Sequence, residues 1–386
     1  MGSTAQEIRK SIEKNWNEYL SKYGNLFSSN SISGSSPPSV FVGSFGYPKV
    51  GVGPMLPPLH GDTSILDMPE RWLGKSLEEI VNFRLSLVRG VHKTSVLEPQ
   101  GRYIESLQEL AMAKNTPDSE VAFEKNTVPT TIIDGQSAPF GPIGEVKNVK
   151  FSGISTSKPI EKTYYDKDLG AEDAVLELYN SGIEISKIQK CFSIGMFGKK
   201  RKLVPTRWSI TATDDIISKN LVEQILDYQQ LDSHLVFFHE HLGNLFSVIL
   251  FPHRWIFEME EAWHTEKGEL GFGADAEDAN GLDHYPSIAG AYFAARLGVA
   301  EYLKKKQRQA GVLVLREIRA EYAIPVGVWQ VREAIRAAIS KNPTGADSLE
   351  QSLDIACKHF SISKSEWLSN GTILRMLKQK SITDYF

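Results

Sequence analysis

Cations and an aromatic side chain stand together in the stretch GKKRKLVPTRW, residues 198–208. Lysine and arginine side chains bind phosphates, and an aromatic ring can stack on a base. The stretch reads as a turn between two strands, which would expose it to solvent. We predict a local nucleic-acid contact here, with a merely solvated turn as the alternative. The candidate DNA-binding residues are Lys199, Lys200, Arg201, Lys202, Arg207 and Trp208.

A second group that could do chemistry is the histidine pair in FFHEHLGN, where His239 and His241 flank Glu240. Alternate residues of a strand point to the same face, and two imidazoles on one face can share a metal ion. The sequence shows no third ligand at a recognisable spacing. We therefore expect ordinary strand-end histidines, with no metal and no cofactor.

Two further segments are rich in glycine and could bind a ligand. Residues 268–286 form an acidic stretch whose carboxylates could hold Mg²⁺ or Ca²⁺, but Ala279 stands where an EF-hand needs its next ligand. We expect a hydrated loop between two domains. Residues 43–53 match no phosphate-binding glycine motif, although their glycines could let a phosphate approach the backbone. An irregular structural loop is the alternative there.

The last eight residues, QKSITDYF, place Gln379, Ile382, Tyr385 and Phe386 at positions 1, 4, 7 and 8. This is the spacing of a peptide that binds the DNA sliding clamp. One turn of 3₁₀ helix brings residues three apart onto one side, so the apolar side chains can form a plug beside the Gln379 amide. The alternative is that the two terminal aromatics dock onto their own domain. The supporting cations are Lys378 and Lys380, which would attract an acidic partner.

The elements that must position these residues can be read from periodicity and caps. Residues 1–25 show helical spacing, and a Ser/Gly/Pro linker follows at 28–39. Residues 127–260 look strand-rich, with a half-buried strand at 206–213. A helix then begins with Asp214 and Asp215 at its positive end. Residues 234–263 read as three strands in a meander.

Helices dominate the rest of the chain. We predict a helix from Ile288 to about Gln309, a strand at 312–318, a helix at about 328–339, and two more helices, with Ser363 and Glu366 capping the last. This segregation predicts an α+β fold. A strand-rich mixed N-terminal region precedes a mainly helical C-terminal region and a flexible C-terminal tail.

Composition limits the classes of function. The 386 residues are enough for two domains, and the net charge of −4 means that any nucleic-acid contact must be a local basic patch. No apolar run approaches the roughly 20 residues that span a bilayer, and no secretion signal is recognisable. We expect a cytoplasmic, nucleoid-associated protein without a membrane partner.

Several segments together resemble one family: VGSFGYPKVGVGPM, PTRWSITATDD, PSIAGAYFAARLGVAEYL, REIRAEYAIPVGVWQVRE and the terminal QKSITDYF. The chain resembles the archaeal Nre DNA repair proteins from about residue 40 to its end. The resemblance implies an Nre N-terminal-like α+β region at 40–270 and an Nre C-terminal-like, mainly helical region at 280–375. The helix and linker at 1–39 precede them, and a clamp-binding (PIP) tail at 376–386 follows.

The same resemblance implies a role in DNA damage repair and binding of the sliding clamp (PCNA) through the terminal peptide. That role falls on Gln379, Ile382, Tyr385 and Phe386. Some relatives are similar to this chain but start with a four-cysteine zinc motif. No cysteine precedes Cys191 here, so no such zinc site is expected.

Two functional hypotheses follow. In the first, the protein is a repair factor tethered to the clamp that contacts DNA or recruits other repair proteins. In the second, its body is a nucleotide- or DNA-modifying enzyme that the clamp delivers to DNA. The second hypothesis needs a pocket near the 43–53 glycine segment, with Arg207, Asp214 or Asp215, and the histidine pair.

Overall fold

The computed structural model describes residues 5–127, 138–264 and 269–373, without the side chains of Lys22 and Tyr23. Contacts between Cα atoms divide the chain into two compact units. The first unit contains Gln6–Ile217 and the short segment Ala323–Gly327, which returns to it from far along the chain. The second unit consists mainly of Ser218–Tyr322 and the described residues from Val328 onward. The 270–280 interval, taken above as a domain boundary, lies inside the second unit.

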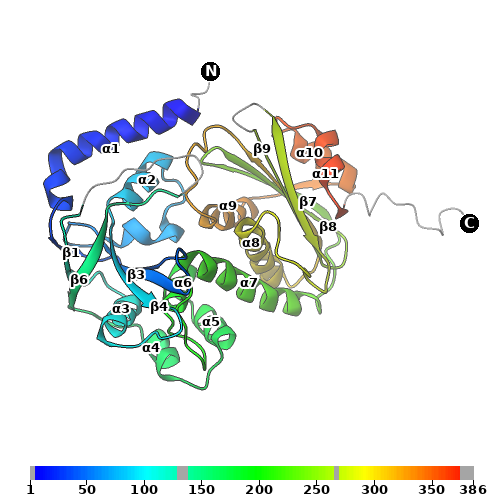
Figure 1. The fold of residues 1–386 in the computed structure, drawn as a ribbon. Helices are drawn as coiled ribbons and strands as arrows, with labels where there is room; N and C mark the ends of the chain where they lie inside the picture. Colours follow the sequence, from blue (N-terminus) through cyan, green and yellow to red (C-terminus); the bar gives the residue numbers. More distant parts are fainter. Residues whose placement is uncertain (1–4, 128–137, 265–268, 374–386) are drawn as a thin grey trace, which may run out of the picture. The chain divides into compact units, whose positions relative to one another are not determined.

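The first unit is built on a six-stranded sheet with strand order β1-β5-β6-β4-β3-β2 (Figure 1). β4 and β6 pair in parallel, and the other neighbours pair antiparallel. The strands are β1 (Ser31–Ser35), β2 (Ser39–Val42), β3 (Lys49–Leu56), β4 (Val88–Ser95), β5 (Asp118–Phe123) and β6 (Ile143–Ser152).

Helices pack around this sheet. They are α1 (Ala5–Phe27), α2 (Leu77–Leu85), α3 (Arg102–Met112), α4 (Lys158–Tyr165), α5 (Ala171–Asn180), α6 (Ile185–Ser193) and the first part of α7 (Thr206–Ile225), with 3₁₀ turns at Ser64–Asp67 and Pro69–Arg71. The predicted N-terminal helix is therefore confirmed, and it buries Ile12 and Trp16. The capping box between Ser76 and Glu79 opens α2 as predicted.

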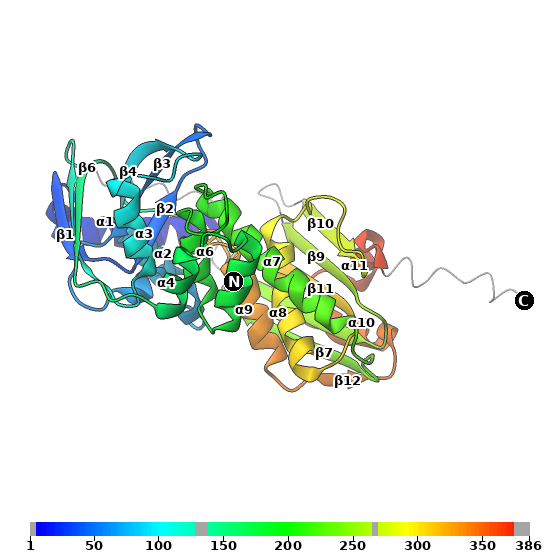
Figure 2. The same cartoon turned by 90° about the horizontal axis from the view of Figure 1, so that it is seen from below.

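The second unit contains a six-stranded sheet with the order β10-β9-β11-β8-β7-β12. α8 and α9 pack together against one face, while α10 and α11 cover the other (Figure 2). Covering both faces explains why β8 is buried along its whole length. The elements are β7 (His234–His241), β8 (Asn244–Phe251), β9 (Ile256–His264), β10 (Leu270–Glu277), α8 (Gly290–Lys306), β11 (Gly311–Ile318), α9 (Trp329–Ile339), β12 (Thr344–Ala346), α10 (Leu349–Cys357) and α11 (Lys364–Asn370).

The predicted α+β class is confirmed, and so are the strands at 234–263, the helices after 287 and the Ser363–Glu366 capping box. The predicted meander is wrong, because β11 inserts between β8 and β9. It pairs antiparallel with β8 and parallel with β9. Residues 270–277 were expected in a loop and instead form β10, which pairs with β9 along its length.

The prediction of a strand at 206–213 is also wrong, because these residues form the start of α7. Ser209, Thr213 and Ile217 are all fully buried. A spacing of four residues marks one face of a helix, and this tertiary burial overrides the strand preference of the β-branched side chains. Asp214 and Asp215 consequently lie inside α7 rather than at its start. The basic run joins two helices, α6 and α7, instead of two strands.

The expected linker at 28–39 contains a strand, β1, that pairs with β5. Its sequence SISGS is small and polar, but Ile32 is buried and Gly34 lies against the backbone of Pro57 and Leu59. Only a residue without a side chain fits that close approach. The small residues that suggested a flexible linker are therefore the ones that fit at this crowded edge of the sheet.

Candidate nucleic-acid interface

The turn between β2 and β3 presents two aromatic side chains to solvent. The hairpin is closed by the backbone hydrogen bonds Gly43 N to Gly51 O, 2.8 Å, and Lys49 N to Gly46 O, 3.0 Å. Gly46 has φ +82°, which suits glycine in this tight turn. At the tip, Phe45 is 97% exposed and Tyr47 is 53% exposed.

Trp208 lies in the first turn of α7 and joins these aromatics. It is 49% exposed, and its ring centroid lies 5.4 Å from that of Tyr47 with an interplanar angle of 49°. The start of the helix is fixed to the sheet because the Val42 amide donates to Thr206 Oγ1 at 2.9 Å. We call Phe45, Tyr47 and Trp208 the aromatic trio.

The basic run ends beside the same hairpin. The Val96 amide donates to Pro48 O, and the Leu203 amide donates to Val96 O, both at 2.9 Å. These bonds place three chain segments side by side, so the end of the basic run lies one segment away from Pro48 of the hairpin. We call the four exposed cations of this region the basic set: Lys199, Lys200, Lys202 and Arg207.

Within the described part of the chain, no carboxylate pairs with any side chain of the basic set. Arg201 differs from its neighbours. It is half-buried, donates a hydrogen bond to the Tyr164 carbonyl oxygen, and lies with its Cζ 4.8 Å from the centroid of the Tyr164 ring. The side chains of the basic set are therefore exposed and could contact phosphates, whereas Arg201 attaches the loop to Tyr164.

The glycines at 43–53 serve the packing of the sheet. Gly43 and Gly51 pair across the hairpin, and a Cβ atom on Gly53 would clash with the Gly90 carbonyl oxygen. The Tyr103 hydroxyl donates to Val52 O at 3.0 Å on the same strand. Close strand-to-strand contact explains these glycines without a bound phosphate.

Asp214, a candidate for the enzyme hypothesis, is fully buried in α7 and accepts a hydrogen bond of 3.3 Å from Gln189 Nε2. Asp215 follows it inside the same helix and also has an interaction partner. Asp214 is therefore a buried structural group, and Asp215 is a partly buried residue with a partner inside the same helix.

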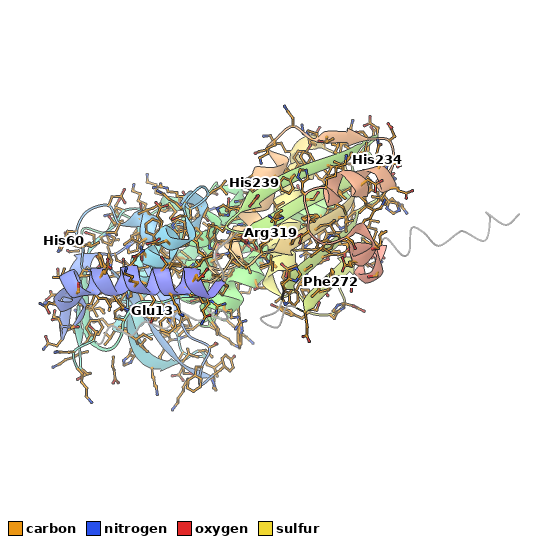
Figure 3. All side chains as sticks on the ribbon, turned by 90° about the horizontal axis from the view of Figure 1, so that it is seen from above. Glu13, His60, His234, His239, Phe272 and Arg319 are labelled. Atoms are coloured by element: carbon orange, nitrogen blue, oxygen red, sulfur yellow. The ribbon has the colours of Figure 1, made fainter. Side chains whose placement is uncertain are left out.

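The histidine pair belongs to the second unit, where His239 lies near the end of β7 (Figure 3). The two rings face the same side, 6.3 Å apart between centroids. Burial lowers the pKa of His241 to about 4, and burial together with nearby Lys341 lowers the pKa of His239. Lys341 Nζ lies 3.0 Å from His239 Nδ1, and an ammonium group there opposes binding of a cation.

Two carboxylates of the acidic segment, Asp275 and Glu277, are buried and paired within the fold, whereas Asp278 and Asp283 are exposed. Asp275 accepts hydrogen bonds from Ser287 Oγ and the Ile288 amide, at 2.8 and 3.0 Å. Glu277 pairs with Arg296 at 2.6 Å. Among the described residues, no three His, Cys, Asp or Glu side chains gather as a metal site would require. No described helix is both long and apolar enough to cross a membrane.

All six candidate residues of the terminal peptide, from Lys378 to Phe386, lie outside the described residues. The described chain ends where β9 holds it. The Glu258 carboxylate accepts hydrogen bonds from the amides of Thr372 and Ile373, the latter at 3.0 Å. Glu258 is fully buried, so this attachment fixes where the terminal segment leaves the unit.

The cations and Trp208 are candidates from the sequence, whereas the exposed Phe45 and Tyr47 are candidates that only the structure adds. Their segment SFGYP reads as a turn because of its glycine and proline. The signal that could have found them is the presence of two large aromatics inside a turn, where side chains have no strand face to bury against.

Comparison with known proteins places this arrangement in context. The family described as Archaeal Nre, N-terminal, matches residues 7–267, and Archaeal Nre, C-terminal, matches residues 277–385. DNA repair protein NreB of Archaeoglobus fulgidus is 38% identical over 360 residues, covering 92% of both chains. DNA repair protein NreA of the same organism is 36% identical, covering 91% of this chain and 89% of that protein.

DNA repair protein NreA of Haloferax volcanii is 30% identical over 402 residues, covering 99% of this chain and 95% of that protein. No solved structure is significantly similar.

Proposed function

Because the chain belongs to the archaeal Nre family, we propose that it is a DNA damage repair factor tethered to the sliding clamp (PCNA) by its C-terminal peptide. The three relatives reported above are all named DNA repair proteins, and each aligns with about nine tenths or more of this chain. That coverage supports a repair role for the chain as a whole. The tether and a contact with DNA are the finer parts of the proposal.

The observation that carries the tether is the spacing of Gln379, Ile382, Tyr385 and Phe386. A single 3₁₀ turn would gather Ile382 with the two aromatics into one apolar plug. Aromatic side chains bury a large area with few rotatable bonds, so they suit a binding hot spot. Gln379 adds an amide at the edge, and the flanking lysines add attraction to an acidic surface.

The attachment of the terminal segment supports the same role. Ile373 is held on β9 by Glu258, and Gln379 follows six positions later. Six residues span at most roughly 20 Å, from the reach of an extended chain. A clamp bound at the terminal peptide would therefore keep the body close to the DNA inside the clamp. A tether of this kind raises the local concentration of a weak DNA contact.

The DNA contact is assigned to the basic set. These four cations are exposed and unpaired with carboxylates in the described part of the chain. The protein as a whole is acidic, with a net charge of −4, so this local surface is what a phosphate backbone would meet favourably.

Titration calorimetry with the cognate clamp tests the tether. We expect the intact protein to bind and Tyr385→Ala/Phe386→Ala to lose at least about 100-fold in affinity, since hot-spot aromatics contribute about 2 kcal/mol or more each. Phe45→Ala is the matched control, because it removes an exposed aromatic from the body and should leave clamp affinity unchanged. Equal binding by the intact protein and the double variant, or binding by neither, would overturn the tether.

A further inference from the structure

We propose that the aromatic trio binds unpaired bases, so that this surface prefers single-stranded over duplex DNA. The inference deepens the DNA contact of the proposed function and rests on it. It specifies the form of DNA that is bound, and it adds Phe45 and Tyr47 to the candidate DNA-binding residues.

The exposure of the trio needs an explanation. Burying a phenylalanine side chain contributes about 1.5–3 kcal/mol relative to leaving it in water, yet Phe45 is almost fully exposed. Other large side chains of the same unit, such as Trp72 and Phe27, are completely buried. A core large enough to bury an aromatic is therefore available, and the hairpin tip holds Phe45 outside it.

The tip is also held in place. Backbone hydrogen bonds cross the hairpin, and a further bond ties Pro48 to Val96. Tyr47 rests beside Trp208, whose helix is anchored through Thr206. Rings that are held against each other before binding, as those of Tyr47 and Trp208 are, lose less conformational entropy when a ligand covers them.

The chemistry favours an unpaired base as that ligand. In a duplex, the face of each base is covered by its neighbours, and only edges and phosphates are open. Reading edges in a groove requires side chains with hydrogen-bond donors and acceptors, which Phe45 and Trp208 largely lack. Single-stranded DNA offers open base faces for stacking, together with phosphates for nearby cations. The basic set supplies cations from the neighbouring segment: Arg207 precedes Trp208 in the chain, and Lys202 precedes Leu203, whose amide bonds to Val96.

A protein partner with an apolar groove fits less well, because four unpaired cations would have to lie at its rim. An anionic membrane surface shares the combination of aromatics and cations. The membrane is therefore a competing outcome that the experiment must separate from DNA.

Fluorescence anisotropy of the full chain provides the test. The probes are a labelled single-stranded oligonucleotide of about 20 nucleotides and the duplex of the same sequence. We expect tighter binding of the single strand, and a loss of at least about 30-fold in Phe45→Ala/Tyr47→Ala, from about 1–3 kcal/mol per stacked base. Because stacking carries no charge, the salt dependence of the remaining binding should be unchanged.

Tyr285→Ala is the matched control, since Tyr285 is 64% exposed but belongs to the second unit. Its affinity for the single strand should equal that of the unaltered protein. Thermal unfolding of both variants should change little, because each substituted side chain is at least half exposed to solvent.

Three results would overturn the inference. Equal losses for single strand and duplex would mean that the trio does not read base faces. Loss of binding to anionic vesicles in Phe45→Ala/Tyr47→Ala, with DNA binding intact, would assign the surface to a membrane. Absence of DNA binding by the unaltered protein would remove the DNA contact altogether, while clamp binding in the calorimetry would still support the tether.

Discussion

One group of cations from each unit shows a different use of positive charge. In the first unit, the basic set is exposed and faces no carboxylate among the described residues. In the second, Arg296 and Glu277 form an ion pair whose side chains are almost fully buried, and Arg316 pairs with Glu261 in a similar setting. A count of charges cannot separate these roles. Burial and pairing decide whether a cation stabilises the fold or remains available to a ligand.

The largest effect that this comparison predicts is on stability. Glu277→Gln would remove the carboxylate that pairs with the buried Arg296 guanidinium, while the glutamine oxygen could still accept from Trp255 Nε1. We expect a loss of about 3–5 kcal/mol in the free energy of unfolding, measured by chemical denaturation.

Glu177→Gln is the matched control for that measurement, because the Glu177 pair with Lys162 is largely exposed to solvent. Solvent screens such a pair, so its loss should leave stability unchanged within error. Similar losses of unfolding free energy in the two variants would show that burial does not determine how much an ion pair stabilises this protein.

A smaller effect concerns pH and the buried His241. Its pKa in the folded protein is about 4, below the ordinary value of 6.5. Between these values the unfolded chain binds more protons, so stability falls as the pH drops from about 6.5 towards 4. By pH 5 this group alone should cost about 2 kcal/mol relative to neutral pH.

His241→Phe lacks the titrating ring, so its free energy of unfolding should change less between pH 7 and pH 5 than that of the unaltered protein. Denaturation at both pH values measures the difference. Parallel changes in the two proteins would show that His241 is not the group responsible.

The smallest expected effect is on binding alone. Lys199→Ala/Lys200→Ala/Lys202→Ala should weaken single-stranded DNA binding about tenfold and lower the salt slope of log K by about two, from roughly 0.7 per lost phosphate contact. Stability should not change. The control is Lys305→Ala/Lys306→Ala, which removes exposed cations at the end of α8 in the other unit. An unchanged salt slope in the triple variant would mean that these lysines make no contact with phosphates.

Local signals predicted the parts of the fold that depend on local physics. The capping boxes at Ser76 and Ser363 and the strands of 234–263 are examples, because caps and alternation act within a few residues. The insertion of β11 between β8 and β9 could not be read this way, since it depends on pairing across about 60 positions. The prediction of a strand at the start of α7 failed because the burial of Ser209 and Thr213 on one helix face outweighed the local preference for a strand.

The candidate site also has a part that local sequence predicts and a part that depends on the folded structure. The basic run and Trp208 can be selected as candidates by residue type, but the exposure of Phe45 and Tyr47 is a property of the folded hairpin. The terminal peptide was recognised from its spacing alone, and it stays a prediction because it lies outside the described residues.

The crossing of the chain between the two units has a consequence for the order of folding during synthesis. The second sheet lacks an inner strand until β11 has been made, up to Ile318. The first unit also waits for Ala323–Gly327, where Ala323 O accepts a hydrogen bond from Arg9 at 2.9 Å. Domains that are continuous in sequence can fold one after the other as they leave the ribosome. Here the first unit is complete only when Gly327 has been made, and the second unit still needs the residues from Val328 onward, so both units stay incomplete for most of the synthesis of the chain.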